Sequence, residues 1–228
     1  QADFDRWCSG HQPFHWFVEF YRIIKDGGFD VIIGNPPYVE YSKVKDSYTI
    51  TGYETETCGN LYAFVVERSQ HLLRNNSGRF GMIVPVSIVS SDRMSPLRKQ
   101  TIQHCGSLWV SNFAIRPQPL FAEIMQRNTI VVAHLGEKEH RLFSTGYIRW
   151  TAAERDLLFN RICLTNVTGL QANEDMIPKV SNRLGAQILE TMGRGSSSVG
   201  VKLRSMNTSV LYFHDSGESY WTKTLLKK

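Results

Sequence analysis

One stretch of ten residues decides the fold: Phe29-Asp30-Val31-Ile32-Ile33-Gly34-Asn35-Pro36-Pro37-Tyr38. Three consecutive β-branched residues with no polar alternation predict a strand that is buried on both faces, as in a parallel sheet. The apolar run stops abruptly at a glycine and two prolines. Because ligands collect at the carboxyl ends of strands in open α/β sheets, we expect Asn35 and Tyr38 to lie at a functional edge.

The residues at this edge suit the binding of a planar amine. Asn35 offers its amide oxygen as an acceptor, and the carbonyl oxygen of Pro36 is a second acceptor nearby. An amine that donates both N–H groups to them has its lone pair drawn out of the ring, which makes it nucleophilic without a general base. Pro36 and Pro37 stiffen the segment, and Tyr38 can stack on a heterocycle. The alternative is a proline-rich turn with a core-packed tyrosine.

Asn35-Pro36-Pro37-Tyr38 resembles the catalytic motif of amino-group methyltransferases that use S-adenosylmethionine, in particular the DNA adenine-N6 branch. The longer match looks like the fused, type IIG-like restriction-modification enzymes, which carry methylase and specificity on one polypeptide. Further matching segments follow in the family's order, and the likeness covers roughly residues 11 to 145: Gly28 to Glu40, Asn60 to Phe64, Gly78 to Pro85, and Thr129 to Val132.

The resemblance implies the C-terminal part of a Rossmann-like methyltransferase sheet with flanking helices, as a partial α/β domain. It implies S-adenosylmethionine as the cofactor, a flipped adenine in double-stranded DNA as the substrate, and catalytic roles for Asn35, Pro36, Pro37 and Tyr38. In the family an aromatic residue near the start of the next helix packs against the adenine of the donor. Phe64 and Tyr62 are the candidates here, and ordinary core packing is the alternative for each.

The same resemblance implies that part of the enzyme is missing. The family's glycine-rich donor-binding loop and its acidic ribose-binding residue precede the catalytic motif, and residues 1 to 34 contain neither. The chain also begins at Gln1 rather than at a methionine. We therefore expect a catalytic-region fragment that works with the remaining N- and C-terminal parts of the same polypeptide and is inactive alone.

Composition sets broad limits. The chain has 228 residues, 42% of them hydrophobic, and no apolar run long enough to cross a bilayer, so we expect a soluble protein. The formal charge of +5 weakly favours an acidic partner such as nucleic acid. Four widely spaced cysteines without a Cys-x-x-Cys pair or a secretory signal fit a reducing cytoplasm. His11, His15 and Glu19 share a helical spacing, but a polar helix face explains them better than a metal site.

Periodicity and turn residues predict the remaining elements. The segment 39–59 reads as a long loop whose tyrosines and lysines suit either nucleic-acid contact or a solvated surface. Asn60 is expected to cap a helix. We expect a catalytic part over 1–150 and a helical or linker extension toward a target-recognition domain over 151–228. The expected elements are helices at 11–25, 61–73, 96–102, 152–162 and 181–192, strands at 79–85, 107–115 and 128–135, a linker at 193–198, and a hairpin at 210–214 and 219–221.

Some questions stay open at this level. Phe121, His134 and Phe143 are candidates for a second ring around a stacked base, and spacing does not choose among them. A protein-glutamine methyltransferase uses a near-identical Asn-Pro-Pro-Tyr clamp on a side-chain amide, so it is an alternative function. A degenerate methylase fold that serves as a non-catalytic DNA-binding scaffold is another.

Overall fold

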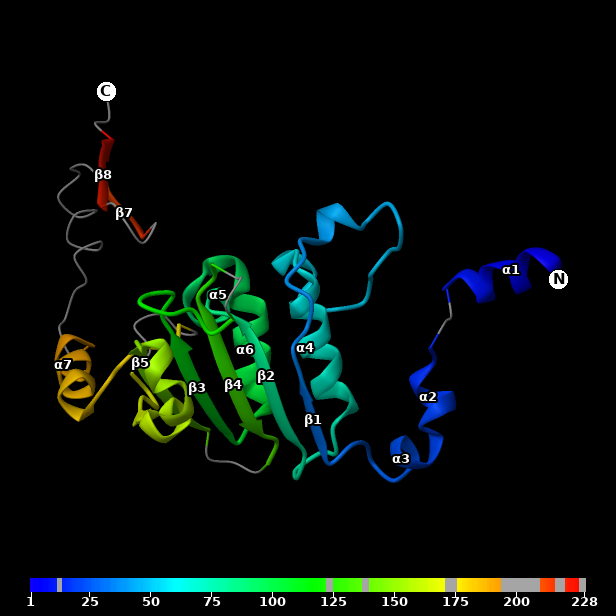
Figure 1. Cartoon of the computed structure of the whole chain (residues 1–228), viewed down its shortest axis with the longest axis horizontal. Helices are drawn as coiled ribbons and strands as arrows, with labels where there is room; N and C mark the ends of the chain where they lie inside the picture. The colour runs from blue at the N-terminus through cyan, green and yellow to red at the C-terminus, as the bar shows by residue number, and fades with distance from the viewer. Residues whose placement is uncertain are drawn as a thin grey trace. The chain divides into compact units, whose positions relative to one another are not determined.

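A computed structural model describes residues 1–11, 14–121, 125–136, 140–170, 176–193, 210–215 and 220–225. The chain divides into two compact units, Gln1–Ala186 and Gln187–Lys228. The first unit contains a six-stranded sheet, and the second contains a two-stranded antiparallel hairpin of β7 (Val210–Asp215) and β8 (Tyr220–Leu225). Figure 1 shows the elements in chain order.

The helices of the described residues are mostly short. The α-helices are α1 (Ala2–His11), α2 (Trp16–Glu19), α3 (Tyr21–Lys25), α4 (Leu61–Leu72), α5 (Ser87–Ser90), α6 (Ser95–His104) and α7 (Arg183–Gly193). The 3-10 helices are η1 (Tyr41–Lys43), η2 (Glu56–Cys58), η3 (Asp92–Met94), η4 (Ala152–Leu157) and η5 (Phe159–Arg161).

The large sheet is mixed, with the strand order β1-β2-β4-β3-β5-β6. Its strands are β1 (Val31–Gly34), β2 (Arg79–Pro85), β3 (Ser107–Phe113), β4 (Asn128–His134), β5 (Arg141–Ile148) and β6 (Thr165–Asn166). β1 is parallel to β2 and β3 is parallel to β5, whereas β4 is antiparallel to both of its neighbours. The carboxyl ends of β1, β2, β3 and β5 therefore lie at one edge of the sheet, together with the start of β4.

Two glycines and a capped helix set the position of β1. Gly27 and Gly28 have φ values of 104° and 109°, a region that glycine enters without a steric penalty, and they end α3. Phe29 then donates its backbone N–H to the carbonyl of Leu72 at the end of α4. At the other end of α4, the side chain of Asn60 accepts the backbone N–H of Tyr62, which confirms the predicted helix cap.

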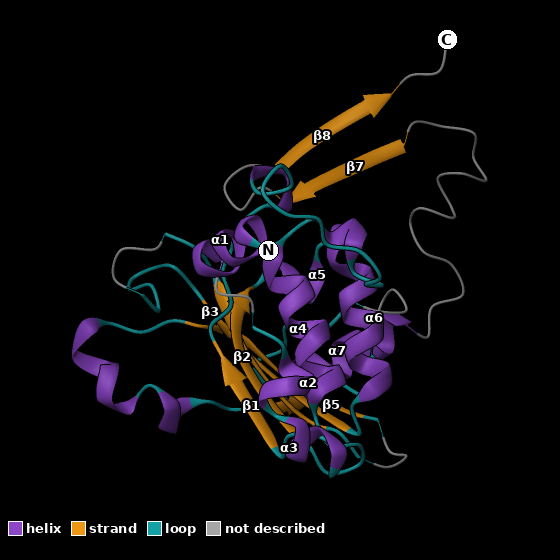
Figure 2. Cartoon of the chain, turned by 90° about the vertical axis from the view of Figure 1, so that its right-hand side faces the viewer, coloured by secondary structure: helices purple, strands orange, loops and turns teal. Residues whose placement is uncertain are grey.

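Helices cover one face of the large sheet. α4, α5 and α6 lie together on that side (Figure 2). Ile88 and Val89 of α5 line a small cavity together with Val110 and Val131 of the sheet. On the other face a second cluster forms around Phe113, Leu120, Trp150 and Leu158. Ile83 and Ile130 pack against this cluster, so the segment that contains η4 covers the part of the second face near the carboxyl ends of the strands.

The strand predicted from the opening stretch is present, but its predicted burial on both faces is wrong. Among the strands that the structure describes, β1 lies at the edge of the sheet and pairs only with β2. Val31 and Ile33 are consequently 54% and 77% exposed. Their apolar, β-branched side chains correctly indicated a strand, because that preference concerns the pleated backbone, whereas burial depends on what neighbours the strand has.

Most other predicted elements are confirmed, and several differ. The single helix expected over 11–25 is broken into α2 and α3 at Phe20, whose φ of −116° and ψ of 30° are not helical, and no residue of either helix is buried. Strand β5 was not predicted. The helix expected over 152–162 is 3-10 rather than α. The predicted linker at 193–198 lies mostly outside the described residues, and the functional boundary at residue 150 stays a prediction.

Candidate active site

The motif Asn35-Pro36-Pro37-Tyr38 directly follows β1, at the edge where the parallel strands end. Gly34, the last residue of β1, pairs with Met82 of β2, so the motif lies alongside the last residues of β2. Asn35 is exposed and Pro36 is buried. The sequence therefore placed the motif correctly, at the carboxyl end of a parallel strand, where an amide group can meet a ligand.

The hydroxyl of Tyr38 joins the motif to β2. Tyr38 Oη lies 2.8 Å from Asn35 Oδ1 and 2.8 Å from the carbonyl oxygen of Ile83. Partial burial raises the pKa of Tyr38 to about 12, because removal of water disfavours the phenolate. The hydroxyl is therefore protonated at any working pH, and the Asn35 amide is held by a side chain of its own motif while its residue remains exposed.

A second tyrosine supports the first. The ring of Tyr62, in the first turn of α4, meets the ring of Tyr38 edge to face, with the centroids 6.3 Å apart. Tyr62 is 1% exposed, and its hydroxyl lies 3.0 Å from Ser87 Oγ of α5. Burial raises the pKa of Tyr62 to about 12 as well. The contact with the buried Tyr62 ring thus restricts the position of the Tyr38 ring.

The residues after the motif are fixed by an ion pair. Glu40 Oε1 accepts hydrogen bonds from Arg93 Nη2 at 2.7 Å and from Asn60 Nδ2 at 3.1 Å. The Arg93 hydrogen bond is the main reason that the pKa of Glu40 lies below its ordinary value. Backbone bonds from Leu61 to Val39 and from Tyr41 to Gly59 hold the same segment. The chain leaving the active-site edge is therefore attached to the start of α4.

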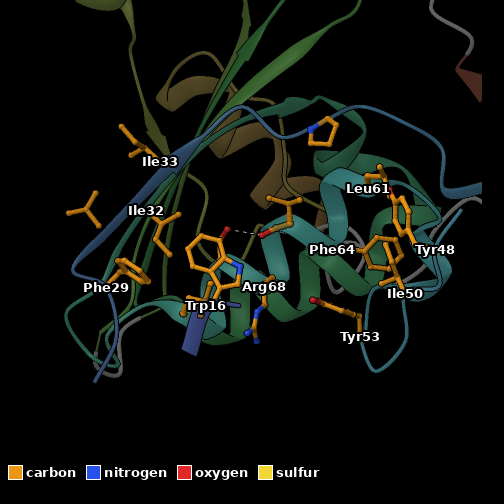
Figure 3. A pocket seen from close by; sticks show the side chains of 15 residues that line it. Trp16, Phe29, Ile32, Ile33, Tyr48, Ile50, Tyr53, Leu61, Phe64 and Arg68 are labelled. Atoms are coloured by element: carbon orange, nitrogen blue, oxygen red, sulfur yellow. Dashed lines mark hydrogen bonds between the residues drawn. The ribbon is translucent and has the colours of Figure 1, made fainter. Parts of the chain in front are cut away.

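A large apolar cavity of about 650 Å³ lies next to the motif (Figure 3). Pro37 and Phe64 belong to its wall, but Asn35, Tyr38 and Tyr62 do not. Tyr41 and Tyr53 of the loop meet the Phe64 ring edge to face. The rest of the wall comes from the start of α2, from β1 and the residue Phe29 before it, from the loop over 39–59 and from α4: Trp16, Phe29, Val31, Ile32, Ile33, Tyr48, Ile50, Tyr53, Leu61, Val65, Arg68, Ser69 and Leu72.

The three candidates for a second stacking ring lie in different places. His134 ends β4 and pairs with Arg79 and Ser107, at the edge opposite to the motif. Phe143 stacks on Trp109 in the middle of the sheet, with the ring centroids 5.9 Å apart. Phe121 precedes β4 at the same edge as the motif, although it packs partly against the Phe113 cluster.

Sequence reasoning missed several residues of this site. The carbonyl of Ile83 is a backbone group in a strand, and nothing in its side chain identifies it. The partnership of Ser87 with Tyr62 joins residues 25 positions apart and also left no signal. The described residues contain no group of three or more His, Cys, Asp and Glu that could hold a metal, and the side chain of His11 is not among them.

Comparisons with known proteins agree with this architecture. Residues 3–121 match the family of Eco57I restriction-modification methylases, which is more than half of the chain. The fold and the matched residues thus place the chain in the methylase class of restriction-modification proteins. The chain belongs to the Eco57I restriction-modification methylase family.

Relatives are much longer than this chain. A protein of Methanocaldococcus jannaschii described as a candidate type II restriction enzyme and methyltransferase is 32% identical over 123 residues, which are 54% of this chain and 10% of that protein.

In the described residues no helix is long and apolar enough to span a membrane.

Among solved structures, a nuclease-deletion mutant of the type ISP restriction-modification enzyme LlaGI, in complex with a DNA substrate mimic, matches with a TM-score of 0.52 and 17% identity. The match covers 71% of this chain and 19% of that chain. A DrdV–DNA complex matches with a TM-score of 0.47 and 14% identity, over 66% of this chain and 18% of that chain. The LlaGI match shows a shared fold.

Proposed function

We propose that this chain carries the catalytic edge of a DNA adenine-N6 methyltransferase that uses S-adenosylmethionine. The observation that carries the proposal is the placement of Asn35 to Tyr38 at the carboxyl end of β1, with the Asn35 residue exposed and its amide held by Tyr38. Membership in a restriction-modification methylase family supports DNA as the substrate. The free cysteines of the described residues, Cys8, Cys58, Cys105 and Cys163, support a cytoplasmic location.

The chain's own groups would bind the target amine. Asn35 supplies an amide oxygen and Pro36 supplies a carbonyl oxygen, and the two together accept both N–H groups of the adenine amine. The ring of Tyr38, supported by Tyr62, stacks on the base. Held in this way, the amine nitrogen presents its lone pair, and its proton leaves after transfer, so that no general base is required. A base in a duplex has to be flipped out to reach this edge.

The cavity beside the motif fits the purine part of the donor. Its volume lies within the range of about 300–1,000 Å³ that is usual for cofactor sites, and its walls are largely apolar and aromatic. S-adenosylmethionine supplies an electrophilic methyl group when it is bound. Of the two residues suggested by the resemblance, Phe64 lines the cavity and is the better contact for the adenine ring. Tyr62 does not line the cavity, and its role would be to hold the Tyr38 ring in place.

We propose that the remaining parts of the same polypeptide complete this domain. One row of directly paired residues crosses the sheet on one face: Ile33, Gly81, Val132, Trp109 and Phe143. Directly paired residues share a face, and Ile33 and Val132 of this row are 77% and 43% exposed. The outer edge of β1 also has no strand partner among the described residues. Proteins usually cover an exposed apolar face and an open strand edge of this kind with another strand or helix.

Residues 1–228 alone should then bind the donor weakly. Calorimetry with S-adenosylmethionine tests this directly. A micromolar dissociation constant for residues 1–228 would refute the expectation. Micromolar binding by the complete polypeptide alone would support it.

The substitution Asn35→Ala in the complete enzyme tests the catalytic proposal. We expect adenine methylation of duplex DNA to fall by about two to three orders of magnitude, because a preorganised acceptor at the reacting amine is lost. Asn75→Ala, at an exposed turn residue, is the matched control and should leave the rate unchanged. A parallel assay with a peptide ending in Gly-Gly-Gln separates DNA from protein-glutamine methylation. Near-normal DNA methylation by the Asn35→Ala variant would refute the proposal.

A further inference from the structure

The hydroxyl of Tyr38 stands between two carbonyl oxygens and can satisfy only one of them. Tyr38 Oη lies 2.8 Å from Asn35 Oδ1 and 2.8 Å from the carbonyl oxygen of Ile83. A phenol hydroxyl carries one proton, and both neighbours are acceptors. Ile83 belongs to β2 and its carbonyl can only accept. One oxygen pair at 2.8 Å would therefore be left without a proton, which is unfavourable in a partly buried place.

A half-turn of the Asn35 amide removes this conflict. The oxygen and the NH2 group of an amide are nearly equal in size, so the turn exchanges them without moving any other atom. We infer that Asn35 Nδ2 donates to Tyr38 Oη, that Tyr38 Oη donates to the Ile83 carbonyl, and that Tyr38 is thereby the positioning residue for the amide oxygen of Asn35. The Tyr38 hydroxyl then donates one hydrogen bond and accepts another, and the Ile83 carbonyl accepts a hydrogen bond from it.

This orientation is the one that the proposed reaction needs, and the inference rests on that proposed function. With Nδ2 turned toward Tyr38, Oδ1 faces the exposed side of the motif, where a second acceptor, the carbonyl of Pro36, belongs to the next residue. An amine with two N–H groups then meets two acceptors. In the opposite orientation the NH2 group of Asn35 would face the NH2 group of the base, donor against donor.

The protonation state of Tyr38 agrees with this role. Burial raises the pKa of Tyr38 to about 12, so the hydroxyl keeps the proton that it donates to Ile83. The raised value also excludes a phenolate that would accept from both neighbours. The Tyr62 ring meets the Tyr38 ring edge to face and limits its movement, which keeps the hydroxyl at the Ile83 carbonyl.

The experiment compares Tyr38→Phe in two backgrounds of the complete enzyme. In the wild-type background, Tyr38→Phe keeps the stacking ring and removes the hydroxyl, and we expect the single-turnover methylation rate to fall about tenfold with DNA affinity unchanged. In the Asn35→Asp background both ends of the side chain are oxygens, so orientation no longer matters. There Tyr38→Phe should change the residual rate by less than about threefold.

The two backgrounds separate the inference from a purely structural role. An equal loss in both, or no loss in the wild-type background, would overturn the inference, because the hydroxyl would not act through the orientation of the amide. A near-normal methylation rate for Asn35→Ala would refute the proposed function itself. The failure of the proposed function and the failure of this inference are therefore distinguishable.

A direct measurement on this 228-residue chain does not depend on activity. In the inferred arrangement a side-chain NH2 proton of Asn35 points at Tyr38 Oη, beside the ε protons of the Tyr38 ring. We expect a strong nuclear Overhauser effect between these protons, and its absence in a folded sample would overturn the inference. The exposed amide of Asn75 supplies the control signal in the same spectrum.

Discussion

The carboxylate of Glu67 accepts the backbone N–H of Thr55 at 3.0 Å and is 1% exposed. Its other oxygen accepts the N–H of Glu54, also at 3.0 Å. Both oxygens of one buried side chain of α4 thus hold the loop over 39–59, which supplies Tyr48, Ile50 and Tyr53 to the wall of the cavity. The loop is irregular in its backbone, but it is attached to the helix at a defined point.

We expect Glu67→Gln to destabilise the protein by about 1–3 kcal/mol, because an amide offers one acceptor where two N–H donors need one each. Urea unfolding measures the free energy, and faster hydrogen exchange at Thr55 would locate the loss in the loop. The control is Glu56→Gln. Glu56 accepts from Gly52 and Tyr53 in an exposed setting, so its change should stay within about 0.5 kcal/mol. Equal stabilities of the Glu67→Gln variant and the wild type would contradict this account.

Gly28 should tolerate no side chain. Its φ of 109° is unfavourable for other residues, and a Cβ atom there would lie 2.6 Å from the carbonyl oxygen of Leu72 and 2.9 Å from that of Leu73. We expect Gly28→Ala to destabilise the protein by more than about 2 kcal/mol in denaturant unfolding, since backbone atoms have to move. Gly52→Ala is the control, with φ of 82° and open space around it. The unfolding free energy of this control should fall by only about 1–2 kcal/mol, because alanine is unfavourable at a positive φ. Equal losses in the two variants would refute the steric argument.

The local part of the fold was predictable from sequence because it depends on neighbours along the chain. The Asn60 cap, the end of α3 at Gly27 and the strand after Gly28 are each determined within a few residues. β5 was not predictable in the same way. Its buried residues include Ser144, Thr145 and Gly146, which carry no apolar signal. Ser144 and Thr145 instead hydrogen-bond to Asn112 of the neighbouring strand β3.

The candidate site was predictable to the same extent. The motif Asn35 to Tyr38 has its own sequence signal, and it lies where strand order places it. The burial of β1 was mispredicted because composition reports the preference of a residue and not the presence of a neighbour. The partners of Tyr38 and Glu40 could not be found either, since Ile83 and Arg93 come from distant segments that only the folded sheet brings together.

The Glu40–Arg93 pair predicts a stability change with pH. The pKa of Glu40 is lowered in the folded state, chiefly by the Arg93 hydrogen bond, so the pair stabilises the protein above the unfolded pKa of about 4.3. That contribution is lost as the pH falls through the lower, folded value. Both side chains are close to half exposed, so the contribution is at most about 1 kcal/mol at neutral pH.

Unfolding free energies of the wild type and of Glu40→Gln, measured at pH 7 and at pH 3, test this expectation. The difference between them should shrink at the lower pH. It should also shrink at pH 7 in an Arg93→Gln background, because the partner is absent there. A difference that stays constant across both comparisons would show that the charge of Glu40 does not stabilise the fold.

The proposed DNA partner predicts a phosphate contact at the same edge. The guanidinium of Arg127 lies 5.4 Å from the ring centroid of Tyr147, and the ammonium of Lys179 lies 5.8 Å from the same centroid. The carbonyl of Arg127 accepts the N–H of Val86, which is three residues after Ile83. Arg127 therefore lies beside the end of β2, at the same edge of the sheet as the motif, where it can reach phosphates that flank a flipped base.

For binding to duplex DNA, the logarithm of the association constant falls linearly with the logarithm of the salt concentration. We expect Arg127→Gln in the complete enzyme to make this slope less steep by about one, because one phosphate contact is lost. Arg141→Gln is the matched control, since Arg141 starts β5 at the opposite edge of the sheet. Its slope should equal that of the wild type. Titrations at several salt concentrations measure both, and an unchanged slope for Arg127→Gln would show that the DNA backbone does not pass over Tyr147.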